Sequence, residues 1–123
     1  IRMFREREGP SNIHLFRNMD PEDFLRLLVH SSGIIGNSSV AIRECSYLGV
    51  PAVNIGSRQQ GRERGGNVID VEHDRRQIVE AVRRHLGGAR PQVDKTYGDG
   101  QAGTGIATCL AERELTVEKR LTY

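Results

Sequence analysis

The sequence predicts an α/β fold in which helices connect the strands of a parallel sheet. Short apolar runs alternate with amphipathic helical segments over most of the chain, and strands spaced by helices in this way form parallel sheets with right-handed crossovers. The hydrophobic content of 37% and the charged content of 28% are ordinary for a globular chain and exclude a disordered one. The 123 residues are enough for one domain.

The first elements follow from local signals. Residues 13–16 are apolar and predict a short strand. Asp20 is a helix N-cap candidate because Pro21 follows it at the first helical position. The helical spacing of apolar residues after it predicts a helix over residues 21–30, with Phe24 among the core residues. Phe16 is expected in the core as well.

Three further strands are expected at residues 33–36, 52–55 and 68–71. Between the first two, the pattern predicts a helix over residues 40–48, which ends at Gly49 because glycine commonly terminates helices.

The last part of the chain contains two predicted helices. Asp74 can cap a helix that ends at Gly87-Gly88. A final helix is expected over about residues 105–115, with Ile106, Leu110 and Leu115 facing inward. We therefore expect a domain over residues 1–115, followed by a loose tail at residues 116–123.

A first candidate binding site follows the strand that ends at Gly36. Parallel sheets bind ligands beyond the carboxyl ends of their strands. Ser38 and Ser39 offer hydroxyl groups there, and the free N–H groups at the start of the next helix suit a phosphate. The alternative is that one serine simply caps the helix.

A second candidate is the loop over residues 56–64, which follows another strand. Its arginines, Arg58, Arg62 and Arg64, can clamp a diphosphate through charge-assisted hydrogen bonds. The alternative is a solvated surface loop. Glu44 can accept hydrogen bonds from a ribose diol if its helix is tilted towards the same crevice, or it can pair with Arg43 on the helix surface.

Composition limits the classes of partner. Acidic residues alternate with basic ones and the formal net charge is +2, so nothing favours a nucleic-acid partner. No apolar run is long enough to cross a membrane. The four histidines and two cysteines lack metal-ligand spacing, so we expect no metal and no cofactor. The sparse cysteines favour a reduced, cytoplasmic protein.

Residues 1–6 indicate the end of a helix already under way, which favours a fragment of a longer protein.

Several motifs together resemble the C-terminal part of the UDP-N-acetylglucosamine 2-epimerases. The residues that carry this resemblance are Gly36-Asn37-Ser38-Ser39, Arg43-Glu44, Leu48-Gly49-Val50-Pro51, Asn54-Ile55-Gly56-Ser57-Arg58-Gln59, Gly61-Arg62-Glu63, Asn67-Val68 and Tyr97-Gly98-Asp99-Gly100. The pattern resembles the hydrolysing branch, which makes N-acetylmannosamine and UDP for sialic acid biosynthesis. The non-hydrolysing branch has an acid-Ser-Gly-Gly stretch where this chain has Asn37-Ser38-Ser39.

The resemblance implies a glycosyltransferase-B-like protein with two Rossmann-like halves, of which this chain is most of the C-terminal, UDP-binding half. It implies that Ser38 and Ser39 bind the diphosphate and that Glu44 binds the ribose hydroxyls of UDP or UDP-GlcNAc. It further places Arg58 on the UDP moiety and the backbone around Met19 at the uracil. The family's catalytic acids belong to a missing N-terminal domain, so no catalytic residue is assigned here. A homo-oligomer is also expected.

Two other functions remain open from the sequence. One is another sugar-nucleotide enzyme of the same architecture, such as a non-hydrolysing epimerase or a glycosyltransferase. The other is a non-catalytic nucleotide-binding module.

Overall fold

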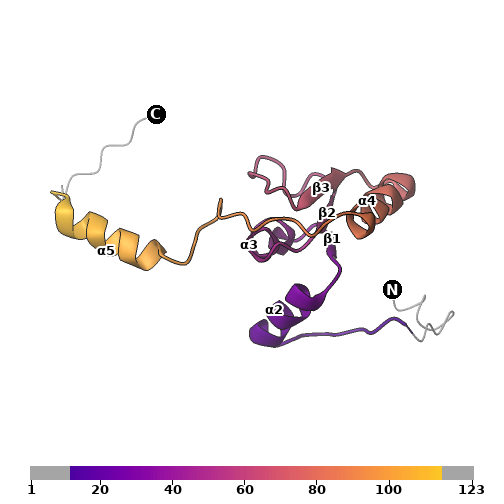
Figure 1. Ribbon diagram of the computed structural model, residues 1–123, viewed down its shortest axis with the longest axis horizontal. Coiled ribbons are helices and arrows are strands. Elements are labelled where there is room, and N and C mark those ends of the chain that lie inside the picture. The colour runs from indigo at the N-terminus through magenta and orange to yellow at the C-terminus, as the bar shows by residue number, and fades with distance from the viewer. Residues whose placement is uncertain (1–11, 115–123) are drawn as a thin grey trace.

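The computed structural model describes residues 12–114. Along the chain its elements are α2 (Pro21–His30), β1 (Ile34–Gly36), the 3-10 helix η1 (Ser39–Ala41), α3 (Glu44–Leu48), β2 (Ala52–Ile55), β3 (Val68–Val71), α4 (Arg75–Gly87) and α5 (Ala102–Glu112) (Figure 1). The predicted helix end at residues 1–6 and the tail at 116–123 lie outside the described residues.

The three described strands form one parallel sheet, as predicted, and they lie in the order β1-β2-β3. Ile34 of β1 is opposite Ala52 of β2, which in turn is opposite Val68 of β3. The strands therefore end together, and the segments after Gly36 and Ile55 begin at the same edge of the sheet.

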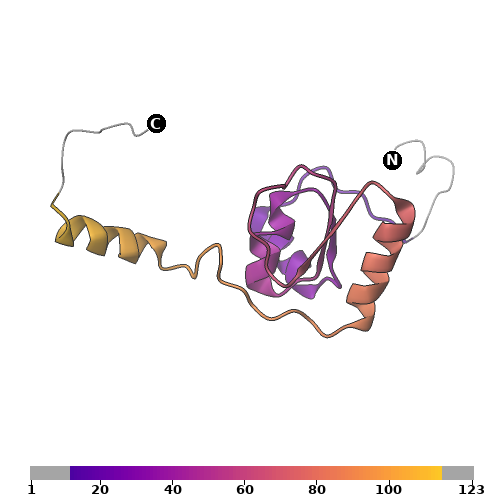
Figure 2. The same cartoon turned by 90° about the horizontal axis from the view of Figure 1, so that it is seen from above.

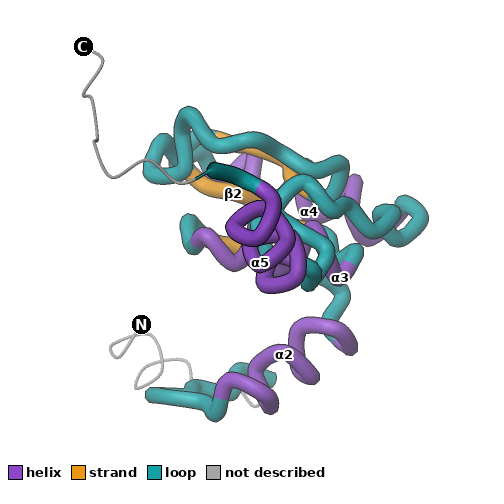
Figure 3. The backbone as a smooth tube through the Cα atoms, turned by 90° about the vertical axis from the view of Figure 1, so that its left-hand side faces the viewer, coloured by secondary structure: helices purple, strands orange, loops and turns teal. Residues whose placement is uncertain are grey.

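One face of the sheet packs against α2 and α3. Leu28, Cys45 and Val50 are buried there. Partly buried apolar side chains surround them, from Phe24, Ile34, Val40 and Leu48. Phe24 is thus in the core, as expected. In Figures 1 and 3, α2 lies below the sheet and apart from α4.

The other face packs against α4, which contacts β2 and β3 (Figure 2). Ala81 of this helix is buried, and His85 Nε2 lies 3.1 Å from the carbonyl oxygen of Ala52. Because side chains alternate across a strand, Ile35 faces away from the core that contains Ile34. Ile35 remains 54% exposed, since α4 covers β2 and β3 but leaves β1 largely open on this side.

Both predicted acidic caps are confirmed. The Asp20 side chain accepts a hydrogen bond from the Glu22 N–H at 3.0 Å, and Asp74 accepts one from the Gln77 N–H at 2.9 Å. These bonds satisfy N–H groups that have no partner within the first turn of a helix. The caps explain why α2 and α4 begin where the sequence predicts.

The expectation of one continuous helix over residues 40–48 is wrong. The segment begins as η1, whose bonds span three residues, and becomes α-helical only at Glu44. At the break, the Ala41 carbonyl accepts a hydrogen bond at 3.0 Å from the Asn67 side chain and none from the Cys45 N–H, the fourth residue along. The break in the helix thus lies where a distant loop contacts its backbone. Its predicted end at Gly49 is confirmed, with φ of +62°.

The predicted strand at residues 13–16 is also wrong. This segment pairs with no strand among the described residues, and its large side chains are exposed. Phe16 is 67% exposed and so lies outside the core. An apolar run is not sufficient for a strand when no neighbouring strand accepts its hydrogen bonds.

The last helix begins earlier than expected and does not face inward. It spans Ala102–Glu112, and Figures 1 and 2 show α5 extending away from the sheet. Ile106 is 61% exposed and Leu110 is 55% exposed, against the expectation that both are buried. Leu115 lies outside the described residues.

Candidate functional site

The turn between β1 and α3 carries the two predicted serines. Ser38 is exposed and caps η1, with its Oγ accepting from the Val40 N–H at 3.4 Å. Ser39 is half-buried. Within residues 12–114, the backbone N–H groups of Ser38 and Ser39 donate to no protein acceptor. Two hydroxyls and two free N–H groups therefore gather at the ligand-binding edge of the sheet. Since η1 has only three residues, these groups, and not a long helix dipole, are what the turn offers an anion.

The loop after β2 contains the three predicted arginines, but they differ in environment. Arg58 and Arg62 are exposed. Arg64 has only 25% of its side chain exposed and forms an ion pair with Asp70 of β3, with Nε 2.9 Å from Oδ2. The Arg64 guanidinium also donates to the carbonyls of Arg62 and Gln59. Arg64 therefore organises its own loop, which leaves Arg58 and Arg62 as the exposed cations.

Asp70 connects this loop to the sheet. Burial raises the pKa of its carboxyl group, but hydrogen bonds from Arg64 and Asn54, with the charge of Arg64, outweigh this effect and lower the pKa below its usual value. The Asn54 amide donates to Asp70 Oδ1 at 2.6 Å. Asp70 is thus a carboxylate at neutral pH that fixes the position of Arg64.

A buried glutamine joins the two candidate loops. Gln59 is 4% exposed, and its Nε2 donates to the Asn37 carbonyl oxygen at 2.8 Å. The structure therefore brings the loop of Arg58 against the turn of Ser38, although these residues are not close in sequence. The sequence motif includes Gln59 but indicates no role for it, because a polar residue between two glycines is typical of a solvated loop.

Asn67 also belongs to a quoted motif, Asn67-Val68, that indicated no role for it. It is 1% exposed, and its Nδ2 donates to the carbonyls of both Ala41 and Val50 at 3.0 Å. The sequence did not indicate its burial, because an asparagine at a strand end commonly belongs to a turn.

Glu44 lies in a different setting from the serines. It is the first residue of α3 and lines a cleft of about 520 Å³. The lining residues are Leu25, Arg43, Glu44, Tyr47, Leu48, Asp94, Tyr97, Gly98, Gly100 and Ala102. Glu44 Oε2 is buried and has no hydrogen-bond partner within the described chain. A carboxylate oxygen in this state can accept a hydrogen bond from a ligand hydroxyl.

The far side of this cleft is the segment that carries the Tyr97-Gly98-Asp99-Gly100 motif. The Tyr97 hydroxyl donates to the Glu63 carbonyl at 3.0 Å, which ties this segment to the arginine loop. Hydrogen bonds from Thr96 lower the pKa of Asp94, which also lines the cleft. The cleft around Glu44 is lined by none of the other predicted site residues, which are Ser38, Ser39, Arg58 and Met19. Met19 is half-buried just before α2. The structure therefore brings the two loops together but gives Glu44 a cleft of its own.

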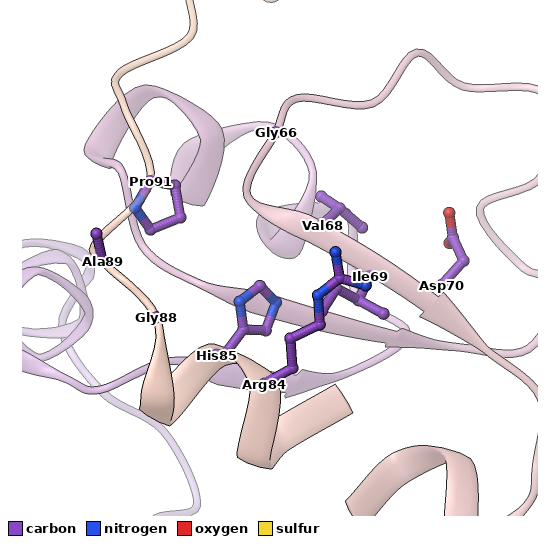
Figure 4. A pocket seen from close by; sticks show the side chains of 9 residues that line it. All are labelled: Gly66, Val68, Ile69, Asp70, Arg84, His85, Gly88, Ala89 and Pro91. Carbon is purple, nitrogen blue, oxygen red and sulfur yellow. The ribbon is translucent and has the colours of Figure 1, made fainter. Parts of the chain in front are cut away.

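A second cleft of about 520 Å³ opens beside β3 and the C-terminal end of α4 (Figure 4). Arg84 and His85 line it together with Gly66 and Pro91. His85 packs against the Ala52 carbonyl, and none of the predicted site residues reaches this cleft. Of the site residues described above, only Asp70 also lines this cleft, so the cleft is separate from the serine turn and from Glu44.

Two kinds of feature are absent from residues 12–114. Among them, no group of three or more His, Cys, Asp or Glu side chains is arranged to hold a metal ion. No helix in this part of the chain combines the length and the apolar character that crossing a membrane requires.

The parallel sheet, with its polar turn and cationic loop at the carboxyl edge, is the architecture of a Rossmann-like α/β domain. Residues 1–111 match the family model described as UDP-N-acetylglucosamine 2-epimerase. The chain belongs to the UDP-N-acetylglucosamine 2-epimerase family.

Individual relatives agree with this family. The chain is 34% identical over 83 residues to the UDP-N-acetylglucosamine 2-epimerase of Neisseria meningitidis. These aligned residues make up 68% of the chain and 22% of that relative. It is 33% identical to the hydrolysing UDP-N,N'-diacetylbacillosamine 2-epimerase of Legionella pneumophila, over 73% of the chain and 24% of the relative. It is 46% identical to the polysialic acid biosynthesis protein P7 of Escherichia coli, over 50% of the chain and 16% of the relative. The chain thus spans less than a quarter of each of these proteins.

Proposed function

We propose that this chain is the UDP-binding part of a hydrolysing UDP-N-acetylglucosamine 2-epimerase. The whole enzyme converts UDP-GlcNAc and water to N-acetylmannosamine and UDP, for sialic acid biosynthesis. The observation that carries this proposal is the family match over residues 1–111, with Ser38 and Ser39 at the carboxyl edge of the sheet. The names of the Legionella and Escherichia relatives support the hydrolysing reaction and the biosynthetic role.

Each predicted site residue has a role in this proposal. Ser38 and Ser39 bind the diphosphate through their hydroxyls and free N–H groups. Glu44 accepts hydrogen bonds from the ribose hydroxyls, which suits its buried, unpartnered oxygen. Arg58 contacts the UDP moiety, and the backbone around Met19 meets the uracil.

The chemical role of this chain is to stabilise the departing UDP. In the proposed reaction a base removes the proton at C2 of the sugar and the C1–O bond to UDP breaks, which leaves a glycal. Water then adds to the glycal with inversion at C2. N–H groups and cations placed at the diphosphate stabilise the negative charge that develops as the bond breaks. The base and acid are supplied by a separate N-terminal domain, so this chain alone is inactive and binds nucleotides weakly.

The proposal includes the organisation of the whole protein. Residues 1–115 form most of a C-terminal UDP-binding domain, with residues 116–123 as its tail, in a glycosyltransferase-B-like arrangement. We further propose a homo-oligomeric protein located in the cytoplasm.

The serine turn is tested by UDP titration of the whole protein that carries this chain. Ser38→Ala combined with Ser39→Ala should raise the Kd for UDP, because each lost charge-assisted hydrogen bond costs about 1.5–3 kcal/mol. Ser32→Ala is the control, since Ser32 is exposed and precedes β1 at the opposite edge of the sheet. An unchanged Kd in the double variant would rule out phosphate binding by the two serine hydroxyls.

Product analysis separates the reaction from its alternatives. The proposal requires free N-acetylmannosamine and UDP from UDP-GlcNAc. UDP-linked N-acetylmannosamine would instead identify a non-hydrolysing epimerase, and a transferred glycoside would identify a glycosyltransferase. The Legionella relative makes UDP-N,N'-diacetylbacillosamine a second substrate to assay. Nucleotide binding without turnover of either substrate would indicate a non-catalytic module.

A further inference from the structure

We propose that Gln59 is a positioning residue for the turn that carries Ser38 and Ser39, an inference that rests on the function proposed above. The Gln59 Nε2 donates to the Asn37 carbonyl oxygen at 2.8 Å, across 22 positions of sequence. Because Gln59 is only 4% exposed, it acts on a ligand through Asn37 and not by direct contact.

The geometry of the peptide group makes this bond relevant to an anion. The Asn37 carbonyl and the Ser38 N–H belong to one planar peptide group, in which they point in opposite directions. Holding the carbonyl towards Gln59 therefore directs the Ser38 N–H away from Gln59. This N–H has no protein acceptor within residues 12–114, so it is free to donate to a phosphate oxygen. Without the glutamine amide, the peptide can rotate and present its carbonyl oxygen, which repels an anion.

Gln59 is itself fixed relative to the sheet. The Arg64 Nη2 donates to the Gln59 carbonyl oxygen at 3.0 Å, and Arg64 is paired with Asp70 of β3. Asp70 in turn accepts a hydrogen bond from Asn54 of β2, which is fully buried. The Gln59 backbone is thus fixed by these bonds, and its side chain by burial and by the bond to Asn37, so binding of a ligand does not have to immobilise it.

A second buried amide supports the same arrangement. Asn67, from the other end of this loop, donates to the Ala41 carbonyl at 3.0 Å. The carbonyls on both sides of Ser38 and Ser39 are therefore held by side-chain amides of the loop between β2 and β3. This loop positions the turn from both of its flanks.

The test compares the affinities of UDP and uridine for the whole protein that carries this chain. Gln59→Met keeps the size of the side chain and removes the amide. We expect the Kd for UDP to rise about three- to tenfold, as for the loss of one neutral hydrogen bond. The Kd for uridine, which has no phosphate, should not change. Gln60→Met is the matched control, because Gln60 is the adjacent, exposed glutamine. If Gln59→Met does not fold, Gln59→Asn withdraws the amide from Asn37 while keeping its polarity.

The outcomes separate this inference from the proposed function. A selective loss of UDP affinity in the Gln59 variant, absent in Gln60→Met, supports the positioning role. Equal losses for UDP and uridine, equal losses in both variants, or no loss would overturn it. A wild-type protein that binds UDP no more tightly than uridine would instead overturn the proposed phosphate site, and this inference with it.

Discussion

At the scale of single residues, Gly65 shows how closely the backbone and side chains approach beneath the candidate site. A Cβ at this position would overlap the Ser46 Oγ and lie 2.9 Å from the Asn67 Oδ1. Ser46 and Asn67 are both buried, so neither side chain has room to move away. The absence of a side chain at Gly65 is therefore a packing requirement, and not a matter of backbone conformation.

Gly65→Ala should lower the free energy of unfolding by about 1–3 kcal/mol, the usual cost of overpacking a dense interior. Chemical denaturation of the purified chain measures the change. Gly66→Ala is the matched control, because nothing lies within 4 Å of a Cβ built there. Equal stability of the two variants would contradict the packing at Gly65.

The two cysteines should differ in reactivity. Cys45 is fully buried, and burial, with the negative charge of Glu44, raises the pKa of its thiol to about 11. Cys109 on α5 is exposed. Because the thiolate is the reactive form, a thiol reagent at neutral pH should label Cys109 quickly and Cys45 only after unfolding. Mass spectrometry of the labelled chain identifies the site, and rapid labelling of Cys45 in the folded chain would contradict the structure.

At the scale of elements, the helices with local caps, α2 and α4, begin where the sequence predicts them. The helix predicted near the site, over residues 40–48, does not form as one helix. The side chains of Asp20 and Asp74 cap α2 and α4 through bonds that span two or three residues. The segment 39–48 is divided at the point where Asn67, far along the chain, donates to the Ala41 carbonyl. Sequence periodicity cannot reveal such a competitor, since it reports only which positions share a helix face.

The ion pair between Asp70 of β3 and Arg64 of the arginine loop should make the free energy of unfolding depend on pH in the acid range. The pKa of Asp70 is lowered in the folded chain, so the unfolded chain binds its proton more tightly. The stabilisation from this group is therefore present above the usual pKa of an aspartate, about 3.9, and is lost as the pH falls below it. Asp70→Asn should reduce the loss of stability between about pH 5 and pH 3, measured by urea unfolding.

Asp23→Asn is the control for this measurement, because it removes the same charge from an exposed position on α2. It should leave the loss of stability in acid close to that of the unmodified chain. A pH dependence that is unchanged in Asp70→Asn would mean that the Arg64–Asp70 contact does not contribute to folding.

At the scale of the whole molecule, α5 is separate from the unit formed by the sheet and the other helices. None of the residues in Ala102–Glu112 is buried, although Ile106 and Leu110 are apolar. By contrast, α4 packs on two strands and buries Ala81. The two helices should therefore contribute very differently to the stability of the chain.

Ala107→Pro should remove helical signal without changing the unfolding temperature of the sheet unit. A proline inside a helix costs about 3 kcal/mol or more, but α5 has no packing for that cost to disrupt. Val82→Pro in α4 is the control, and it should lower the unfolding temperature strongly. Circular dichroism during heating measures both effects. A marked fall in the unfolding temperature of Ala107→Pro would show that α5 packs on the rest of the chain.

Local periodicity and residues close in the chain were enough to predict the parallel α/β architecture, the acidic caps and the positions of β1, β2 and β3. Its motifs also led to the family, which the match over residues 1–111 confirms. The folded structure was needed to show that η1 and α3 are separate, that Arg64 pairs within the protein, and that Gln59 and Asn67 are buried. Each of these depends on hydrogen bonds between segments distant in sequence, whose partners no local pattern specifies.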